Sequence, residues 1–223
     1  MNSTPALEVR GLTRTYGEGA GAVTALAGVD LAFAPGTFTA VMGPSGSGKS
    51  SLLALVGGFL DPAFTASGKV LLEDRDITDF RAEARGIGLL FQDALLFPHF
   101  SVGQNLLFGL RPGVRGKAHR RAEAESMLAK VGLAGTFDRD PATLSGGEAA
   151  RIALGRTLLA APKALLLDEA FSRLDTALRQ SVRALVFDLI RETRIPAILV
   201  THDHEDALAA GSAVLDLGTG EIR

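Results

Sequence analysis

The sequence predicts an α/β fold built around a parallel sheet, and three observations carry this prediction. The glycine-rich stretch Gly43–Ser50 lies between an alternating segment, Thr37–Met42, and a run of apolar helix formers, Ser51–Val56. That order indicates a strand, a tight turn and a buried helix. An apolar run through Leu165–Leu167 ends in two carboxylates, as strands covered on both faces do. The composition, 47% hydrophobic but only 6% aromatic, is the aliphatic balance of this class.

Length and charge limit the classes of protein that the chain can belong to. Its 223 residues can bury a sizeable core. The net charge of −2 and the pI of about 6.1 provide no overall basic field, so we expect no nucleic-acid partner. The absence of cysteine excludes disulfides, thiolate metal sites and cysteine nucleophiles. No apolar run approaches the ~20 residues of a spanning helix, and residues 1–5 do not resemble a signal peptide. We therefore expect a soluble chain that reaches any membrane through a partner.

The N-terminal part contains several short segments with strand character. Ala6–Leu12 alternates weakly, and Val23–Leu26 and Val29–Phe33 are two further short runs. Pro35-Gly36 then predicts a turn into the strand at Thr37–Met42. Short strands at this spacing predict a small antiparallel sheet beside the parallel one.

The middle of the chain changes character at about residue 93. Before it, Gly68–Leu72 and Gly86–Phe91 are predicted strands; after it comes the apolar loop Leu95–Phe100, and Ser101 is a helix cap. The basic cluster within Arg111–Arg121 is typical either of a nucleic-acid contact or, more often, of a solvated helix face. We predict one domain over residues 1–223, with a core formed by 1–92 and 144–223 and a helical subdomain at 93–143.

The last third alternates between helices and strands. Leu144–Glu148 begins a predicted helix that continues to Ala160, and apolar residues repeat at helical spacing over Leu174–Leu189. Pro196–Thr201 is the next predicted strand. A short helix and a final strand, Ala213–Leu217, complete the chain.

The stretch between the first parallel strand and its helix is a full match to the phosphate-binding pattern G-x-x-x-x-G-K-[ST]. Its glycines allow backbone N–H groups to point at phosphate oxygens, and the helix N-terminus adds partial positive charge. Lys49 is then expected to reach the β- and γ-phosphates and Ser50 to bind Mg²⁺. The alternative is a glycine-rich turn that binds nothing.

Polar groups at strand ends predict hydrolysis of the bound phosphate. Asp168 is placed to hold Mg²⁺, and Glu169 to accept the proton of the attacking water. Gln92 and His202 also end apolar strands, where α/β sheets contact their ligands. Tyr16, the only tyrosine, either stacks on an adenine ring or is a packed aromatic.

The sequence also resembles the ABC ATPases, on Leu144–Glu148 followed by Arg151 and then by Leu165–Glu169. The resemblance extends over essentially the whole chain and implies a P-loop NTPase core with a small antiparallel β subdomain and an inserted α-helical subdomain. It implies that the chain is an ATPase that uses ATP and Mg²⁺. It assigns nucleotide contacts to Tyr16, Gly43, Pro44, Ser45, Gly46, Ser47, Gly48, Lys49, Ser50, Ser51, Ser145, Gly146, Gly147 and Asp175. It assigns catalysis to Glu169, His202 and Gln92, and the metal to Ser50, Gln92 and Asp168.

The same resemblance implies partners. Within the family, Gln92 with its apolar loop and Phe171–Asp175 are similar to the importer branch that serves iron, thiamine, polyamine and sulfate permeases. That branch implies a head-to-tail homodimer, transmembrane permease subunits, a periplasmic or surface substrate-binding protein, and a place on the cytoplasmic face of a bacterial membrane. The alternatives are a soluble ABC ATPase acting on nucleic acid or ribosomes, and a phosphate-loop kinase or GTPase. The cargo is not indicated.

Overall fold

A computed structural model of the chain describes residues 5–16, 23–59, 65–209, 214–217 and 221–222. Its centre is a six-stranded sheet in the order β10-β9-β3-β8-β7-β6, in which every neighbouring pair is parallel except β10 with β9. The predicted parallel sheet is thus confirmed. Its strands are β3 (Phe38–Met42), β6 (Ile87–Leu90), β7 (Ala164–Asp168), β8 (Ala197–Val200), β9 (Val214–Asp216) and β10 (Glu221–Ile222).

The two faces of this sheet belong to two different hydrophobic clusters. In β7 the fully buried Leu165 and Leu167 pack into one cluster, while Ala164 and Leu166 pack into the other. This alternation follows from the two-residue period of a strand, and it explains why β7 is apolar without interruption. The first cluster is shared with the helices that lie between residues 102 and 193, and the second with α1 (Lys49–Gly57) and the antiparallel sheet.

A second, antiparallel sheet has the order β2-β1-β4-β5. Its strands are β1 (Leu7–Tyr16), β2 (Val23–Phe33), β4 (Thr65–Leu72) and β5 (Arg75–Asp76). The predicted small antiparallel sheet is therefore confirmed. The expectation of two separate strands at Val23–Leu26 and Val29–Phe33 is wrong, because β2 is one strand with register shifts against β1. Gly28, with φ 65°, lies where we expected the two strands to be separated. The glycine belongs to an irregularity within one strand, which the sequence pattern does not distinguish from a turn.

The short 3₁₀ turn η2 (Ala82–Ala84) precedes β6, and a helical segment follows β6. It contains α2 (Val102–Phe108), α3 (Lys117–Lys130) and the 3₁₀ turn η3 (Pro141–Thr143). Ser101 caps α2 as predicted, in a capping box with Gln104. Two of the basic residues are paired within the segment: Arg120 donates to the Leu107 carbonyl, and Arg121 pairs with Glu125 and Asp138. The boundaries at 93 and 143 stay a prediction.

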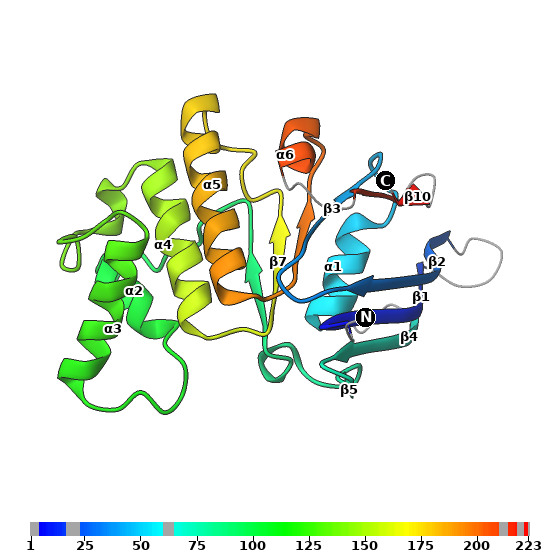
Figure 1. The fold of residues 1–223 in the computed structure, drawn as a ribbon, viewed down its shortest axis with the longest axis horizontal. Coiled ribbons are helices and arrows are strands. Elements are labelled where there is room, and N and C mark those ends of the chain that lie inside the picture. The colour runs from blue at the N-terminus through cyan, green and yellow to red at the C-terminus, as the bar shows by residue number, and fades with distance from the viewer. Residues whose placement is uncertain (1–4, 17–22, 60–64, 210–213, 218–220, 223) are drawn as a thin grey trace.

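Three helices begin at the edge where the parallel strands end. Figure 1 shows α1, α4 (Gly146–Leu159) and α5 (Thr176–Thr193) each starting at its upper end, the direction in which the arrow of β7 points. The remaining helix, α6 (His204–Ala209), follows β8 at the same edge. Because helix N-termini carry partial positive charge, this edge is suited to an anionic ligand.

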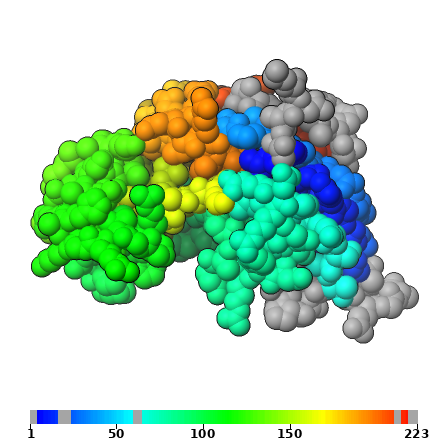
Figure 2. All heavy atoms as spheres, turned by 60° about the horizontal axis from the view of Figure 1, so that its bottom comes forward, coloured from blue at the N-terminus to red at the C-terminus, as the bar shows by residue number. Residues whose placement is uncertain are grey.

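The helical segment stands apart from the rest of the surface. In Figure 2 the green helices and the teal region around β5 and η2 form two masses with a hollow between them. Of the helices in the described residues, none has the length and apolar character needed to cross a bilayer.

Candidate active site

The loop Gly43–Ser50 joins β3 to α1 and has the backbone geometry of a phosphate cradle. Gly43, Gly46 and Gly48 have φ values of 141°, 84° and 94°, which side-chain-bearing residues rarely adopt. A Cβ at Gly48 would also lie 2.3 Å from the Ala25 carbonyl oxygen. The glycine at this position is therefore required twice, by its conformation and by the close approach of β2.

A pocket of about 490 Å³ opens beside this loop, within the range of small-molecule sites. It joins segments that are far apart in the sequence. Its lining consists of Tyr16, Ala25, Ser45, Gly46, Gly48, Lys49, Ser50, Ser51 and Glu169. Predicted residues from β1, from the loop and from the end of β7 therefore share one hollow.

The loop presents positive charge and free donors to this pocket. The Lys49 ammonium donates to the carbonyl oxygens of Gly43, at 2.7 Å, and Pro44, at 2.9 Å. Helix α1 has no side-chain cap and no acidic residue in its first turn. No side chain of that turn therefore competes with an anionic ligand for the first N–H groups of the helix. The Ser47 hydroxyl oxygen, which is buried and has no hydrogen-bond partner among the described residues, belongs to a residue that lines a different pocket, beside β2. A cradle with these donors fits a polyphosphate.

Tyr16 ends β1 at the rim of the pocket. Its hydroxyl and the Ser51 hydroxyl are 2.7 Å apart, which ties the aromatic ring to the first turn of α1. The guanidinium of Arg14 lies 4.7 Å from the ring centroid. The ring is half-buried. The tyrosine is therefore anchored by Arg14 over one face of its ring and by its hydroxyl, and its role in adenine binding stays a prediction.

The two carboxylates at the end of β7, Asp168 and Glu169, differ in environment. Burial raises the pKa of Asp168, and the neighbouring Glu169 raises it further, while Lys49 lowers it. Glu169 has φ 47°, an uncommon conformation for a residue with a side chain and one that costs about 1–3 kcal/mol. It is held there by bonds from its N–H to Val200 and from the Ser172 N–H and hydroxyl to its carbonyl. Such strain concentrates at functional positions.

Glu169 and His202 meet, although 33 positions separate them. Glu169 Oε1 and His202 Nδ1 are 3.1 Å apart. His202 follows β8, and the next residue, Asp203, is paired with Arg179 of α5. Arg179 also donates to the Ser172 carbonyl, at 3.2 Å. The turns after β7 and β8 are thus fastened to α5 and to each other.

Other predicted residues lie outside the lining of this pocket. The side chain of Gln92 is exposed and makes no hydrogen bond to any described residue. Asp175 is the N-cap of α5, where its carboxylate accepts from the Leu178 N–H at 3.0 Å. Ser145–Gly147 form the start of α4, on the opposite face of the sheet from α1. The chain's own loop and its own α4 therefore do not enclose the same ligand.

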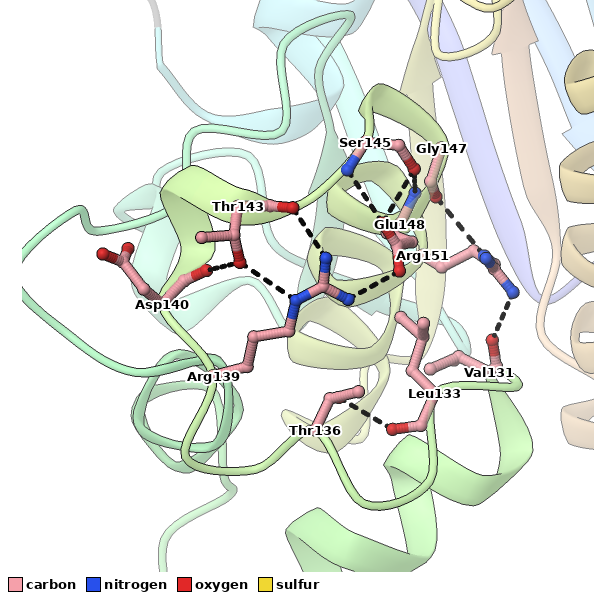
Figure 3. Close-up of polar contacts among 10 residues, drawn as sticks. All are labelled: Val131, Leu133, Thr136, Arg139, Asp140, Thr143, Ser145, Gly147, Glu148 and Arg151. Atoms are coloured by element: carbon pink, nitrogen blue, oxygen red, sulfur yellow. Dashed lines mark hydrogen bonds and ion pairs between the residues drawn. The ribbon is translucent and has the colours of Figure 1, made fainter.

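The start of α4 is built by a network of hydrogen bonds, shown in Figure 3. Ser145 and Glu148 form a capping box, in which the Ser145 N–H donates to Glu148 Oε2 at 2.8 Å. Arg139 donates to Glu148 Oε1 at 2.8 Å. Gly147 packs against α5, since a Cβ there would lie 2.4 Å from a Leu178 methyl carbon. The helix N-terminus is thereby rigid before any ligand arrives.

These contacts lower the pKa of Glu148 from 4.5 to about 2, chiefly through the Ser145 N–H and then through Arg139 and the Ser145 hydroxyl. Because the folded pKa lies below the unfolded one, the stabilisation from Glu148 is complete above about pH 4.5 and is lost as the pH falls towards 2. We predict that Glu148→Gln is less sensitive than wild type to acid over this interval. Urea unfolding at a series of pH values measures it, and parallel curves for the two proteins would contradict the assignment.

Two features of this site were not predicted from the sequence: the contact of Arg139 with Glu148, and the role of Glu148 in the capping box of α4. The spacing Ser145-Gly146-Gly147-Glu148 is the S-x-x-E pattern of a capping box and could have indicated the latter. Nothing in the sequence indicated that Arg139 reaches the same carboxylate. The ion pair between Arg173 and Asp93, which connects the turn after β7 to the loop after Gln92, was not predicted either.

The fold and this site define a nucleoside triphosphatase of the phosphate-loop class. The family described as ABC transporter matches residues 26–172. The uncharacterized ABC transporter ATP-binding protein YnjD of Escherichia coli (strain K12) is 50% identical over 192 residues, which cover 86% of this chain and 88% of YnjD. The chain therefore belongs to the ABC transporter family, and it is an ATPase that uses ATP and Mg²⁺. The resemblance stated from the sequence is confirmed.

Two longer relatives and one solved structure are also similar. PotA of Frankia alni, a spermidine/putrescine import ATP-binding protein, is 40% identical over 223 residues, all of this chain but 47% of PotA. FbpC of Agrobacterium fabrum, an Fe(3+) ions import ATP-binding protein, is 40% identical over 91% of this chain and 56% of FbpC. The chain thus spans about half the length of these two relatives. The dimeric, post-hydrolysis structure of the ATP-binding cassette MJ0796 with ADP and Pi matches with a TM-score of 0.80, at 29% identity over 97% of this chain and 96% of that one.

Proposed function

We propose that this chain powers a bacterial solute importer from the cytoplasmic face of the membrane, where permease subunits hold it. The observation that carries the proposal is the pocket in which the phosphate loop meets Glu169, while the anion-binding start of α4 lies elsewhere on the surface. The names of PotA and FbpC, both import ATP-binding proteins, support the direction of transport. A periplasmic or surface binding protein would deliver the solute, and the permease would select it.

In this proposal the phosphate loop binds the nucleotide and oxygen ligands bind the metal. Lys49 and the loop N–H groups hold the β- and γ-phosphates, and Tyr16 stacks on the adenine. The hydroxyl of Ser50, the carboxylate of Asp168 and the amide oxygen of Gln92 fit Mg²⁺, which prefers a few such donors together with phosphate oxygens. Mg²⁺ held by these groups would supply positive charge that neutralises the phosphates.

Glu169 is then the general base, and His202 is its positioning partner. A carboxylate at the pocket wall can take the proton of a water that attacks the γ-phosphate. The 3.1 Å contact with His202 Nδ1 fixes the direction of that carboxylate and leaves the second ring nitrogen for the phosphate. The strained backbone of Glu169 supports the same role, because such strain concentrates at functional positions.

We further propose that two copies close head to tail, so that Ser145–Gly147 of one copy contact the γ-phosphate held by the other. The N-terminus of α4 offers N–H groups and a hydroxyl that its own pocket does not use. The dimeric structure of the cassette MJ0796, bound to ADP and Pi, supports the association of two copies. Hydrolysis would then require both copies, and ATP would hold them together.

Ser145→Arg is expected to lower ATP hydrolysis by about 10²–10³-fold, the usual cost of losing one transition-state donor, with ATP binding unchanged. A steady-state phosphate-release assay and a fluorescent-nucleotide titration measure the two effects. Ser126→Arg, the same change on the exposed side of α3, is the control. Normal hydrolysis by Ser145→Arg would contradict the shared site.

The permease is proposed to dock on an aromatic patch made by the Leu95–Phe100 loop and the end of α2. Phe108 is 65% exposed and Leu95 58% exposed, and the rings of Phe97 and Phe108 are 4.6 Å apart. The fully buried Asn105 fixes the loop by bonding both the N–H and the carbonyl of Phe97, at 2.8 and 3.1 Å. A rigid, exposed apolar surface of this kind supports a groove for a short permease helix.

Changing both Leu96 and Phe97 to serine is expected to abolish association with the permease and transport, while the ATPase activity of the isolated subunit is kept. The apolar contact is lost, but the nucleotide pocket is untouched. Co-purification with an intact permease measures it. Phe59→Ser, at the half-exposed ring beyond α1, is the control. Full recovery of the complex with the double variant would mean that docking occurs elsewhere.

A further inference from the structure

The start of α4 carries a negative charge beside the groups that are proposed to bind a phosphate. Glu148 lies in the first turn of α4, and its Oε2 accepts from both the N–H of Ser145, at 2.8 Å, and the hydroxyl of Ser145, at 2.9 Å. A carboxylate there stabilises the helix. It also repels an incoming γ-phosphate and occupies the hydroxyl proton that this phosphate needs.

Arg139 is the cation that faces this carboxylate. Its Nη1 donates to Glu148 Oε1 at 2.8 Å, on the oxygen that Ser145 does not use. Both side chains are half-buried, with 35% and 21% exposed, so the pair is partly shielded from solvent. The two oxygens of Glu148 are therefore divided between one serine and one arginine.

The guanidinium is held in place by the turn that precedes the helix. Arg139 Nε donates to Thr143 Oγ1 at 2.9 Å, and Nη2 donates to the Thr143 carbonyl at 2.6 Å. The Thr143 hydroxyl donates in turn to the Asp140 carbonyl, at 2.7 Å. Figure 3 shows Arg139 between this turn and Glu148, with a donor directed at each. A rigid fork of this kind is specific to arginine.

We propose that Arg139 is a positioning residue for the shared nucleotide site, and that it acts through Glu148. By neutralising the carboxylate and holding its Oε1, Arg139 removes the repulsion of the γ-phosphate. It also weakens the hold of Glu148 on the Ser145 hydroxyl, which is then able to turn towards the partner's nucleotide. This inference rests on the proposed head-to-tail closure, and it adds a residue that touches neither ATP nor the metal.

The test measures ATP-driven dimerisation in the Glu169→Gln background, where hydrolysis does not intervene. Arg139→Ala should raise the ATP·Mg²⁺ concentration for half-maximal dimerisation by at least about 10-fold, the value of one hydrogen bond to a charged group. ATP binding by the monomer should stay unchanged, because the phosphate loop is intact. Arg121→Ala, which removes an arginine paired with Glu125 and Asp138, is the matched control.

A second substitution separates an effect through Glu148 from a general loosening of the turn. Glu148→Gln keeps an oxygen for the capping box but has no charge, so adding it to Arg139→Ala should restore dimerisation to within about 3-fold of the parent. Arg139→Lys, which keeps the charge without the fork, should be intermediate. Dimerisation of Arg139→Ala at the parent's ATP concentration would overturn the inference, as would a double variant no better than Arg139→Ala. A parent that never dimerises with ATP would overturn the proposed closure itself.

Discussion

Replacing Glu169 with glutamine is expected to lower ATP hydrolysis by roughly 10²–10⁴-fold, the usual contribution of a general base. The amide keeps the size of the side chain and its contact with His202 Nδ1, but it cannot accept the proton of the attacking water. ATP affinity should stay the same, because the phosphate loop is unchanged. Phosphate release and nucleotide titration measure the two quantities.

The control for this variant is Glu192→Gln, which changes an exposed glutamate that pairs with Lys130. That variant should hydrolyse ATP at the wild-type rate. If Glu169→Gln also did so, Glu169 would not be the base, and the strained conformation at this position would need another explanation.

Replacing Lys49 with alanine is expected to weaken ATP binding by at least about 10-fold, because hydrogen bonds to a charged group are lost. In the present structure the ammonium is held over the loop by the Gly43 and Pro44 carbonyls, at 2.7 and 2.9 Å. It is thus positioned above the cradle before nucleotide arrives. Titration of a fluorescent ATP analogue measures the loss.

The control for this variant is Lys163→Ala. Lys163 lies directly before β7, away from the phosphate loop, and its ammonium pairs with Glu73. The ATP affinity of Lys163→Ala should equal that of wild type. An affinity of Lys49→Ala that matches this control would show that the loop does not hold the phosphates, and it would contradict the nucleotide site as a whole.

Much of the fold could be predicted because the order of apolar and polar residues along a strand indicates which of its faces are buried. The run Ala164–Leu167 is apolar on both faces, and both faces are indeed covered. Ser101 and Ser145 were predictable as the starts of helices, since caps are local. The continuity of β2 was not predictable, because Gly28 at a bulge looks like a turn until the pairing with β1 is known.

The candidate site could be predicted where its residues form a contiguous motif or end a strand. Lys49, Ser50 and Glu169 are of this kind, and all three line one pocket. Contacts between distant side chains could not be predicted. The bond of Tyr16 to Ser51 and that of Arg139 to Glu148 each depend on how separate elements pack, and no spacing in the sequence encodes that.

The most direct test of the shared nucleotide site is the mass of Glu169→Gln in solution, measured by multi-angle light scattering with and without ATP·Mg²⁺. We expect a monomer without nucleotide and a dimer with ATP, because the γ-phosphate of each copy bridges to Ser145–Gly147 of the other. ADP should not produce the dimer, since it lacks that phosphate. A stable dimer without nucleotide that Ser145→Arg leaves unchanged, or a monomer in saturating ATP·Mg²⁺, would contradict the shared nucleotide site.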